Sequence, residues 1–420
     1  MQALLLAAGQ SKRFQPLGDK NFFPIGDKFL VERAVANLQK AGIKKIILVA
    51  NSTNQKRLAE IFPKFEIVVQ RNLATGMAGA VLAAKEFLDQ PTLIASTNDL
   101  VEASQIRKVL TAKNCAGAIL SQKVTKYFPG GYLEIQDDEI KNIIEKPEPN
   151  KAPSDLINLV FHFFREPQKL ITELSKTINK KDNGYELALA KLFKNAKFIA
   201  VENRGTWRTI KFPWHALDLI ANFLKRQKSK VSPRAEIAKS AIVKNSVIES
   251  GAKILDFAIV KNSFIGRNAV VGSYSLVRDS QILENAVVGS SSEVARSSIG
   301  TNSWLHRDYV GDSILAENVS LGSGAVCANL RLDEGEISSL IEKQKIGAQR
   351  NKFGCAVGAG SRIGVNTSIM PGVLIGENCF VGSGLVVAQN LKSQSFLDAT
   401  WKTKIKLNRK SVETRAKFQK

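Results

Sequence analysis

The pattern of apolar and polar positions changes near residue 230. Before that point, short apolar runs alternate with amphipathic stretches. The apolar runs predict strands at 46–49, 67–69 and 92–95, and the amphipathic stretches predict helices at 29–40, 78–88 and 215–225. This alternation predicts a doubly wound α/β domain of the Rossmann-like type over residues 1–225, with a mostly parallel sheet covered by helices on both faces.

A different period begins after the polar, charged segment 226–233, which we interpret as a linker. Aliphatic residues first recur at steps of five or six, and then at a strict step of six at Val357, Ile363, Ile369, Ile375, Val381 and Val387. Neither a helix nor a flat strand has this period. A parallel β-helix of hexapeptide repeats does, because each face of the triangular coil contributes one inward aliphatic side chain. Asn366 and Asn378 then fall at corners, where the backbone must turn.

The repeats predict a β-helix over residues 234–400. The polar segment 332–353 interrupts them and predicts a loop or short arm that projects from the coil. Residues 401–420 hold eight Lys and Arg residues against one Glu and form a predicted basic tail beyond the β-helix.

The amino-acid composition indicates which kinds of ligand and partner the chain binds. The chain has 60 Lys and Arg against 38 Asp and Glu, a net charge of +22 that favours anionic ligands such as nucleotides, sugar phosphates and coenzyme A. The basic residues form no legible nucleic-acid-binding module, so we expect no nucleic-acid partner. No apolar run approaches the roughly 20 residues of a membrane helix, and the start of the chain lacks a signal-peptide layout. The four cysteines form no CxxC pair, which is typical of reduced thiols in a cytoplasmic protein.

The start of the chain carries the strongest chemical signal. An apolar first strand ends at Gly9, and the small residues there allow backbone N–H groups to surround an anion. Arg13 and Lys20 bring two cations to the same rim. Ligands of such sheets bind beyond the carboxyl ends of the strands, so this loop predicts a triphosphate site.

This opening, Leu-Ala-Ala-Gly with Arg13 and Lys20 at fixed spacing, resembles the sugar-1-phosphate nucleotidyltransferases, and the resemblance extends over residues 1–225. In that family an oxygen of the sugar phosphate attacks the α-phosphorus of a nucleoside triphosphate and pyrophosphate leaves. The resemblance implies roles for these residues: nucleotide binding by Leu6, Ala7, Ala8, Gly9, Gln70, Ala74 and Thr75; catalysis by Arg13 and Lys20; magnesium binding by Asp99; and sugar-phosphate binding by Gly131, Glu145, Lys146 and Asn158.

The segment 207–214 departs from the family pattern. It matches a family segment that supplies a second metal ligand, an Asp or Asn, but Thr209 and Lys211 occupy those positions here. A protonated lysine cannot ligate magnesium. Lys211 therefore either replaces part of the ion's charge or marks an impaired domain. Ala74 and Asn98 each replace a family glycine.

The β-helix contains the third candidate catalyst. Of the three histidines, we interpret His162 and His215 as structural, whereas His306 precedes Tyr309 and Asn329 in an order that resembles the archaeal bifunctional glucosamine-1-phosphate acetyltransferase/UDP-N-acetylglucosamine pyrophosphorylases. The resemblance implies that His306 is the general base on the sugar amine, that Tyr309 binds the phosphate and that Asn329 holds the substrate. A neutral imidazole suits this role near neutral pH. The resemblance also implies acetyl-CoA as acyl donor, bound along the coils of a homotrimer near Gly364, Asn366 and Ser383.

Together these features predict a magnesium-dependent enzyme that makes a UDP-sugar such as UDP-N-acetylglucosamine, or a dTDP-sugar, with an amino-sugar-1-phosphate N-acetyltransferase in its β-helix. Two alternatives stay open. One is a mannose-1-phosphate guanylyltransferase-like enzyme with a regulatory β-helix. The other is a degenerate, non-catalytic scaffold that binds sugar nucleotides.

Overall fold

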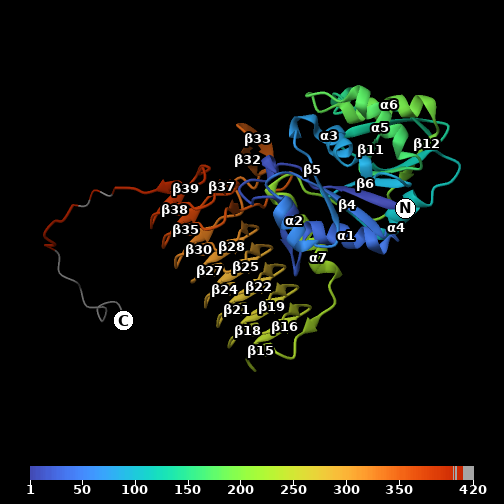
Figure 1. Ribbon diagram of the computed structural model, residues 1–420. Coiled ribbons are helices and arrows are strands. Elements are labelled where there is room, and N and C mark those ends of the chain that lie inside the picture. The colour runs from blue at the N-terminus through green and yellow to red at the C-terminus, as the bar shows by residue number, and fades with distance from the viewer. Residues whose placement is uncertain (401, 403, 410–420) are drawn as a thin grey trace.

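The computed structural model describes residues 1–400, 402 and 404–409. An α/β half and a column of β-helix coils lie against each other along one side of the column (Figure 1). The predicted basic tail, residues 401–420, lies largely outside the described residues.

The sheet of the α/β half is built around the buried first strand. Its order is β10-β9-β11-β6-β1-β4-β5, and β8 pairs with both β11 and β12. The strands are β1 (Gln2–Leu6), β4 (Lys45–Ala50), β5 (Glu66–Val69), β6 (Thr92–Ser96), β8 (Gly117–Lys123), β9 (Gly131–Gln136), β10 (Glu139–Glu145), β11 (Leu156–Phe164) and β12 (Phe198–Glu202). The pairings β1–β4, β1–β6 and β4–β5 are parallel, as predicted. Strand β11, however, runs antiparallel to β6, β8 and β9, so the sheet is mixed rather than mostly parallel.

Helices cover both faces of this sheet. The helices are α1 (Leu30–Lys40), α2 (Gln55–Ile61), α3 (Gly76–Ala83), α4 (Ala103–Leu110), α5 (Pro167–Thr177), α6 (Gly184–Asn195) and α7 (Pro213–Arg226). Residues of α1, α2 and α4 pack into one buried cluster, and residues of α3, α5 and α6 pack into another on the opposite face. The predicted helix 78–88 ends earlier, at Ala83, and continues as a single 3-10 turn over Lys85–Phe87. Helix α7 begins at Pro213, a residue suited to the first helical turn.

The β-helix consists of three ladders of short parallel strands. The first ladder is β14 (Lys230–Val231), β17 (Val247–Ile248), β20 (Phe264–Ile265), β23 (Gln281–Ile282), β26 (Ser298–Ile299), β29 (Ile314–Leu315), β34 (Cys355–Val357) and β37 (Val373–Ile375). The second is β15 (Glu236–Ile237), β18 (Lys253–Ile254), β21 (Val270–Val271), β24 (Val287–Val288), β27 (Trp304–Leu305), β30 (Ser320–Leu321), β35 (Arg362–Ile363), β38 (Phe380–Val381) and β40 (Phe396–Leu397). The third is β16 (Ile242–Lys244), β19 (Ile259–Lys261), β22 (Leu276–Arg278), β25 (Glu293–Ala295), β28 (Tyr309–Gly311), β31 (Val326–Cys327), β36 (Ser368–Ile369) and β39 (Val386–Val387).

The inward aliphatic residues of the hexapeptide repeats form one continuous core, as the six-residue period predicts for a parallel β-helix. Its left-handed type is what the resemblance of the repeats to the hexapeptide-repeat β-helix family implies. Ile265, Ile369 and Ile375 are all fully buried there. The corners use asparagines with positive φ, including Asn366 and Asn378 at 53° each. The first ladder begins at Lys230, inside the segment 226–233 that we expected to be a linker.

A shared apolar cluster joins the two halves. Helix α7 lies on the outer face of the first ladder, and its Trp214 packs edge-on against Phe353 with ring centroids 5.8 Å apart. The side chain of Gln281 accepts a hydrogen bond from Gly26 N at 2.9 Å and donates one to Pro24 O at 3.0 Å. The α/β half is therefore fixed to the β-helix by apolar packing and by polar contacts.

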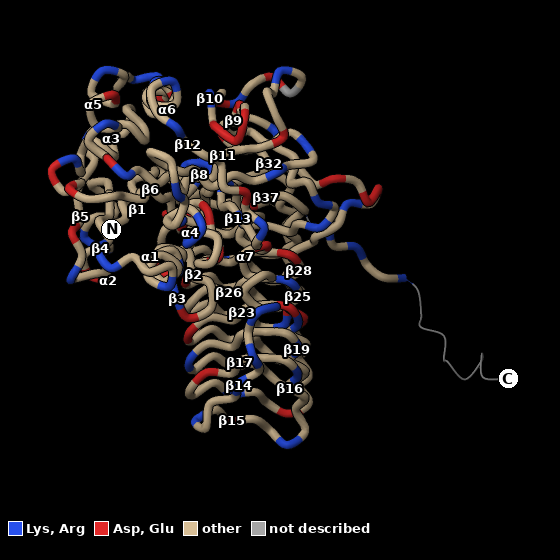
Figure 2. The backbone as a smooth tube through the Cα atoms, turned by 90° about the vertical axis from the view of Figure 1, so that its right-hand side faces the viewer, with Lys and Arg blue, Asp and Glu red and all other residues tan. Residues whose placement is uncertain are grey.

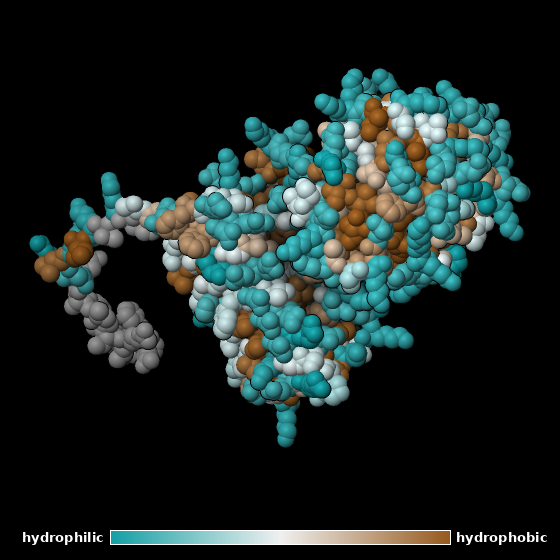
Figure 3. All heavy atoms as spheres, in the orientation of Figure 1, coloured by the Kyte–Doolittle hydropathy of each residue, from teal (hydrophilic) through white to brown (hydrophobic). Residues whose placement is uncertain are grey.

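The interrupting segment 332–353 is more ordered than a simple loop. It contains the hairpin strands β32 (Ser338–Ile341) and β33 (Gln344–Gly347). Two more small pairs lie at the junction of the halves, namely β2 (Pro24–Ile25) with β3 (Lys28–Phe29) and β7 (Asp99–Val101) with β13 (Trp207–Thr209). Charged residues are spread over both halves (Figure 2), and apolar side chains interrupt the polar surface of each (Figure 3).

Candidate active sites

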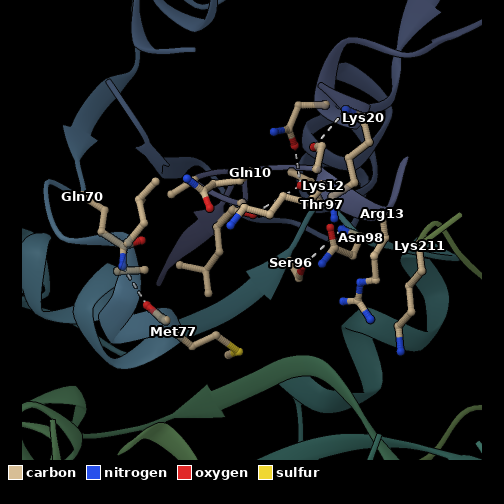
Figure 4. Close-up of a pocket in the computed structure, with 18 of the residues that line it drawn as sticks. Gln10, Lys12, Arg13, Lys20, Gln70, Met77, Ser96, Thr97, Asn98 and Lys211 are labelled. Carbon is tan, nitrogen blue, oxygen red and sulfur yellow. Dashed lines mark hydrogen bonds between the residues drawn. The ribbon is translucent and has the colours of Figure 1, made fainter. Parts of the chain in front are cut away.

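A pocket of about 470 Å³ opens at the carboxyl ends of β1 and β6 (Figure 4). This is where the sequence places the triphosphate loop. The lining residues include Leu6, Ala8, Gly9, Arg13, Lys20, Gln70, Asn98 and Lys211. A Cβ added to Gly9 would meet no atom within 4 Å, so the backbone at this position leaves space for a ligand.

Buried polar side chains fix the loop that carries Arg13 and Lys20. Asp19 accepts hydrogen bonds from Asn21 N and from Asn54 Nδ2, both at 2.9 Å. Asn21 and Asn54 each donate in turn to Ala7 O at 2.9 Å. Ala7 therefore supports the loop from behind rather than lining the pocket. Sequence reasoning missed these residues; Asp19 directly before a short 3-10 helix was the available signal, because it is a favoured N-cap residue.

Three cations lie at one end of the pocket. Figure 4 shows Arg13 and Lys211 lying side by side, with Lys20 above them in the view. Burial, reinforced by the charge of Arg13, lowers the pKa of Lys20 to about 8. Burial also lowers the pKa of Lys211, although Asp99 opposes that shift. Such mutual repulsion is relieved when an anion binds.

Lys211 has a defined position. Its Nζ donates to Pro129 O at 3.1 Å and lies 4.3 Å from the centre of the Phe128 ring. These contacts place a fixed positive charge in the pocket, at the segment where the nucleotidyltransferase family supplies a metal ligand.

Asp99 lies beside the pocket and is half-buried. Its Oδ1 accepts a hydrogen bond of 2.8 Å from the indole of Trp207, and Thr209 lies directly opposite it in the β7–β13 pair. Burial raises the pKa of Asp99, while Trp207, Lys211 and Thr209 oppose the shift. In the described part of the chain, no group of three or more His, Cys, Asp and Glu side chains could hold a metal ion.

The side of the pocket away from Arg13 and Lys211 is formed by Gln70, Leu73, Gly76 and Met77. The Gln70 amide donates to Gly76 O at 2.8 Å and to Asn72 O at 3.1 Å, which orients its own oxygen as an acceptor. Ala74 and Thr75 belong to the same turn but do not line the pocket; Thr75 Oγ1 donates to Asn72 O at 2.6 Å.

The predicted sugar-phosphate residues gather on β9, β10 and β11. Gly131 pairs with Glu145 in the sheet, and a Cβ at Gly131 would lie 3.0 Å from Glu145 Oε2 and 3.1 Å from Asn158 Oδ1. A side chain at Gly131 would therefore crowd both Glu145 and Asn158. Lys146 forms an ion pair with Glu145 at 3.0 Å, so all four residues belong to one cluster.

In the β-helix, His306 follows β27 at an exposed corner. Its backbone N–H donates to Asp308 Oδ2 at 2.7 Å, and its ring lies 6.3 Å from the ring of Trp304. Among the described residues, no hydrogen bond involves the imidazole of His306, which is an exposed residue.

Tyr309 and Asn329 lie together over Gly311 on the next face. A Cβ at Gly311 would come within 2.6 Å of Asn329 Nδ2 and 2.7 Å of the Tyr309 hydroxyl. Asn329 donates to Asp312, which also pairs with Arg296. The structure thus brings Tyr309 and Asn329 together, while His306 lies at the preceding corner. Sequence reasoning missed Arg296 and Asp312, which stack on successive coils and could have been found from the coil length.

The α/β half has a pocket lined by several cations at the carboxyl ends of its strands, and it is joined to hexapeptide-repeat coils that carry an exposed histidine. These features define a nucleotidyltransferase-like chain with a transferase-type β-helix. Comparisons with known proteins agree. A family model described as the MobA-like NTP transferase domain matches residues 3–134, and one described as bacterial transferase hexapeptide (six repeats) matches residues 354–389.

Relatives match nearly the whole chain. The "Bifunctional protein GlmU" of Methanococcus maripaludis strain C7 is 37% identical over 410 residues, covering 94% of this chain and 97% of the relative. The "Bifunctional sugar-1-phosphate nucleotidylyltransferase/acetyltransferase" of Sulfurisphaera tokodaii is 31% identical over 404 residues, covering 93% and 98%. The chain therefore belongs to the GlmU-type family of bifunctional sugar-1-phosphate nucleotidyltransferase/acetyltransferase enzymes. No helix in the described residues is long and apolar enough to cross a membrane.

Proposed function

We propose that the α/β half transfers a nucleotidyl group from a nucleoside triphosphate to a sugar-1-phosphate, and that the β-helix acetylates an amino-sugar-1-phosphate. The observation that carries the first activity is the convergence of Arg13, Lys20 and Lys211 in the pocket at the end of β1. The second rests on His306, Tyr309 and Asn329 and on family membership.

In nucleotidyl transfer, the sugar-phosphate oxygen attacks the α-phosphorus, and the bond to the pyrophosphate oxygen breaks. Negative charge grows on the leaving group, and fixed cations stabilise it most when they are already in place. Arg13 and Lys20 fill this role. The cluster of Gly131, Glu145, Lys146 and Asn158 holds the sugar phosphate that attacks.

Magnesium enters on the triphosphate as part of the substrate, and it keeps several water ligands in such sites. Asp99 is the carboxylate we assign to it. Because Thr209 stands opposite Asp99, the protein supplies one carboxylate there, and Lys211 supplies positive charge instead of a second ligand. Asp99→Ala should abolish pyrophosphate release and leave the circular dichroism spectrum unchanged. A variant that retained most activity would overturn this metal assignment.

In acetyl transfer, the amine nitrogen attacks the carbonyl carbon of the acetyl-CoA thioester. The carbon–sulfur bond breaks, the amine gives up a proton and coenzyme A leaves as its thiol. We assign His306 as the base that takes the proton. Tyr309 binds the phosphate of the sugar, and Asn329, oriented by Asp312, holds the substrate.

We propose that the coils form a homotrimer and that acetyl-CoA binds along them near Gly364, Asn366 and Ser383. Large apolar side chains on the second ladder support an interface, with Trp304 53%, Phe380 55% and Phe396 71% exposed in the single chain. We place the enzyme in the cytoplasm, consistent with its four buried, unpaired cysteines.

The nucleotide product we favour is UDP-N-acetylglucosamine or a related UDP- or dTDP-sugar. A panel of four nucleoside triphosphates and several sugar-1-phosphates, read by pyrophosphate release, tests this choice. Preference for GTP with mannose-1-phosphate would favour the guanylyltransferase alternative. If both the wild type and Lys211→Asp bind a nucleotide but release no pyrophosphate, the non-catalytic scaffold is favoured.

A further inference from the structure

The β-helix contributes a residue to the nucleotidyltransferase pocket. The insertion between β31 and β34 forms the hairpin β32–β33, whose strands pair from Ser338↔Gly347 to Ile341↔Gln344. The two-residue turn of this hairpin is Glu342-Lys343, and Glu342 lines the same pocket as Arg13 and Lys211.

Several contacts hold the hairpin in this position. Ser339 Oγ donates to Gly372 O at 2.7 Å, and Asn390 Nδ2 donates to Leu340 O at 2.8 Å. Ile341, next to Glu342, is buried in one apolar cluster with Phe14 and Ile210. Phe14 and Ile210 directly adjoin Arg13 and Lys211 in sequence, and Glu342 at the hairpin tip lines the same pocket as these two cations.

The turn has an unfavourable backbone conformation for its residues. Glu342 has φ 45° and Lys343 has φ 68°, the region that two-residue hairpin turns normally fill with Asn-Gly or Gly-Gly. The side chain at this tip is an exposed carboxylate that lines the rim of the pocket.

The charge of Glu342 opposes that of its surroundings. The pocket is lined by Lys12, Arg13, Lys20 and Lys211, yet within the described residues no ion pair or hydrogen bond engages the Glu342 carboxylate. The carboxylate is thus left to act on a ligand. It repels a bare triphosphate, whereas the water ligands of a magnesium ion on the triphosphate are hydrogen-bond donors that suit it.

We propose that Glu342 is a specificity residue of the nucleotidyltransferase pocket that selects the triphosphate carrying a divalent cation over the free triphosphate. This inference rests on the proposed nucleotidyl transfer. In this proposal, the hairpin inserted in the β-helix forms part of the nucleotide-binding site of the α/β half.

Calorimetric titration of the full-length protein tests the assignment. The four common nucleoside triphosphates are each titrated with magnesium chloride and with EDTA, into the wild type, Glu342→Gln and Glu334→Gln. Glu334 is the matched control, because it is an exposed carboxylate of the same insertion and does not line the pocket. Glu342→Gln should tighten binding of the metal-free triphosphate about twofold to fivefold, the range for an exposed charge interaction. Its affinity for the magnesium form should stay constant or fall, and Glu334→Gln should match the wild type.

The outcomes separate the two claims. One outcome is that the wild type binds a triphosphate while Glu342→Gln shows the same ratio of affinity for the magnesium-bound triphosphate to affinity for the free triphosphate. In that case the role proposed for Glu342 is refuted and the proposed nucleotidyl transfer stands. The role of Glu342 is equally wrong if Glu334→Gln changes the ratio as much. If the wild type binds none of the four triphosphates in either form, the proposed transfer fails, and the hairpin assignment fails with it.

Discussion

The two halves of the chain build their sites in opposite ways. The α/β half gathers Gly9, Gln70, Lys211 and Glu342 from distant parts of the sequence into one pocket and ties the loop beneath them with buried polar side chains. The β-helix instead places His306 on an exposed corner whose position follows from the stacking of similar coils. The difference teaches that the first site is complete within one chain, whereas the second is an open surface that substrates or a further subunit must cover.

Burial changes the chemistry of one site more than that of the other. Lys20, enclosed and close to Arg13, has a pKa lowered to about 8. His306 is an exposed residue whose imidazole lies beside Trp304, which is itself 53% exposed. The charges of the pocket therefore already shift the pKa of Lys20 before a ligand binds. The surroundings of His306, in contrast, depend on the molecule or subunit that covers this corner.

The largest expected effect is on the open corner. His306→Ala should reduce acetyl transfer to glucosamine-1-phosphate or galactosamine-1-phosphate by ~10²–10⁴-fold, the usual contribution of a positioned base. Free-thiol release from acetyl-CoA measures the rate. Pyrophosphate release should not change, because the pocket lies in the other half. Equal acetyl transfer by the variant and the wild type would remove His306 from the mechanism.

The next effect is on the enclosed pocket. Arg13→Ala removes a charge-assisted phosphate contact and should weaken binding of the triphosphate roughly tenfold or more. Calorimetry measures the affinity. Arg234→Ala, an exposed arginine at the start of the β-helix, is the control and should bind like the wild type. Unchanged affinity in Arg13→Ala would refute the assignment of the triphosphate loop.

A smaller effect is expected on the pH dependence of triphosphate binding in the enclosed pocket. The Lys20 ammonium binds phosphate only when protonated, so affinity for the triphosphate should fall as pH rises through about 8. Since the charge of Arg13 contributes to the low pKa, the midpoint should move upward in Arg13→Ala. Titrations from pH 6.5 to 9.5 test both statements. A pH-independent affinity would contradict the shift of Lys20.

The smallest effect is on stability in acid. Burial lowers the pKa of His162 from 6.5 to about 3. Below pH 6.5 the unfolded chain therefore binds a proton at this histidine, whereas the folded chain does not. The free energy of unfolding of the α/β half falls accordingly as the pH drops below 6.5. Burial raises the pKa of Glu186 to about 7, which opposes this effect in the same half. In the β-helix, burial raises the pKa of Asp308 from 3.8 to about 6, so protonation stabilises the folded coils between those pH values.

His162→Phe isolates the histidine contribution. Hydrogen exchange followed by mass spectrometry between pH 6.5 and 4.5 should show a flatter acid dependence for peptides of the α/β half in the variant. Peptides of the β-helix should be the same in both proteins. An identical slope in the α/β half would show that His162 does not carry the acid sensitivity.

Much of this architecture could be predicted from local pattern. The six-residue period specifies the inward column of the β-helix because each coil repeats the same local environment, and the buried runs at 46–49 and 92–95 became β4 and β6. The antiparallel pairing of β11 could not be predicted in this way, because the apolar pattern of a largely buried strand does not reveal the direction in which its neighbours run.

The residues of the candidate site also differ in how far they could be predicted from local sequence. Arg13, Lys20 and Gly9 are close in sequence, and their spacing alone brings them to one rim. Gln70 and Lys211 lie far from this loop in sequence, and only the family resemblance placed them in the site. Asn54, which contacts the loop from the segment after β4, and Glu342, which lines the pocket from the β-helix, were not predicted. Their positions depend on how the helices and the two halves pack, which no local pattern encodes.

The central claim is that one chain carries two separate transferase sites, and a single one-pot measurement tests it most directly. The purified protein receives acetyl-CoA, glucosamine-1-phosphate, UTP and magnesium, and the products are separated by mass. The wild type should form UDP-N-acetylglucosamine. His306→Ala should form it only when N-acetylglucosamine-1-phosphate is supplied, and Arg13→Ala should accumulate N-acetylglucosamine-1-phosphate. Loss of both reactions in either variant, with the fold intact, would contradict two separate sites.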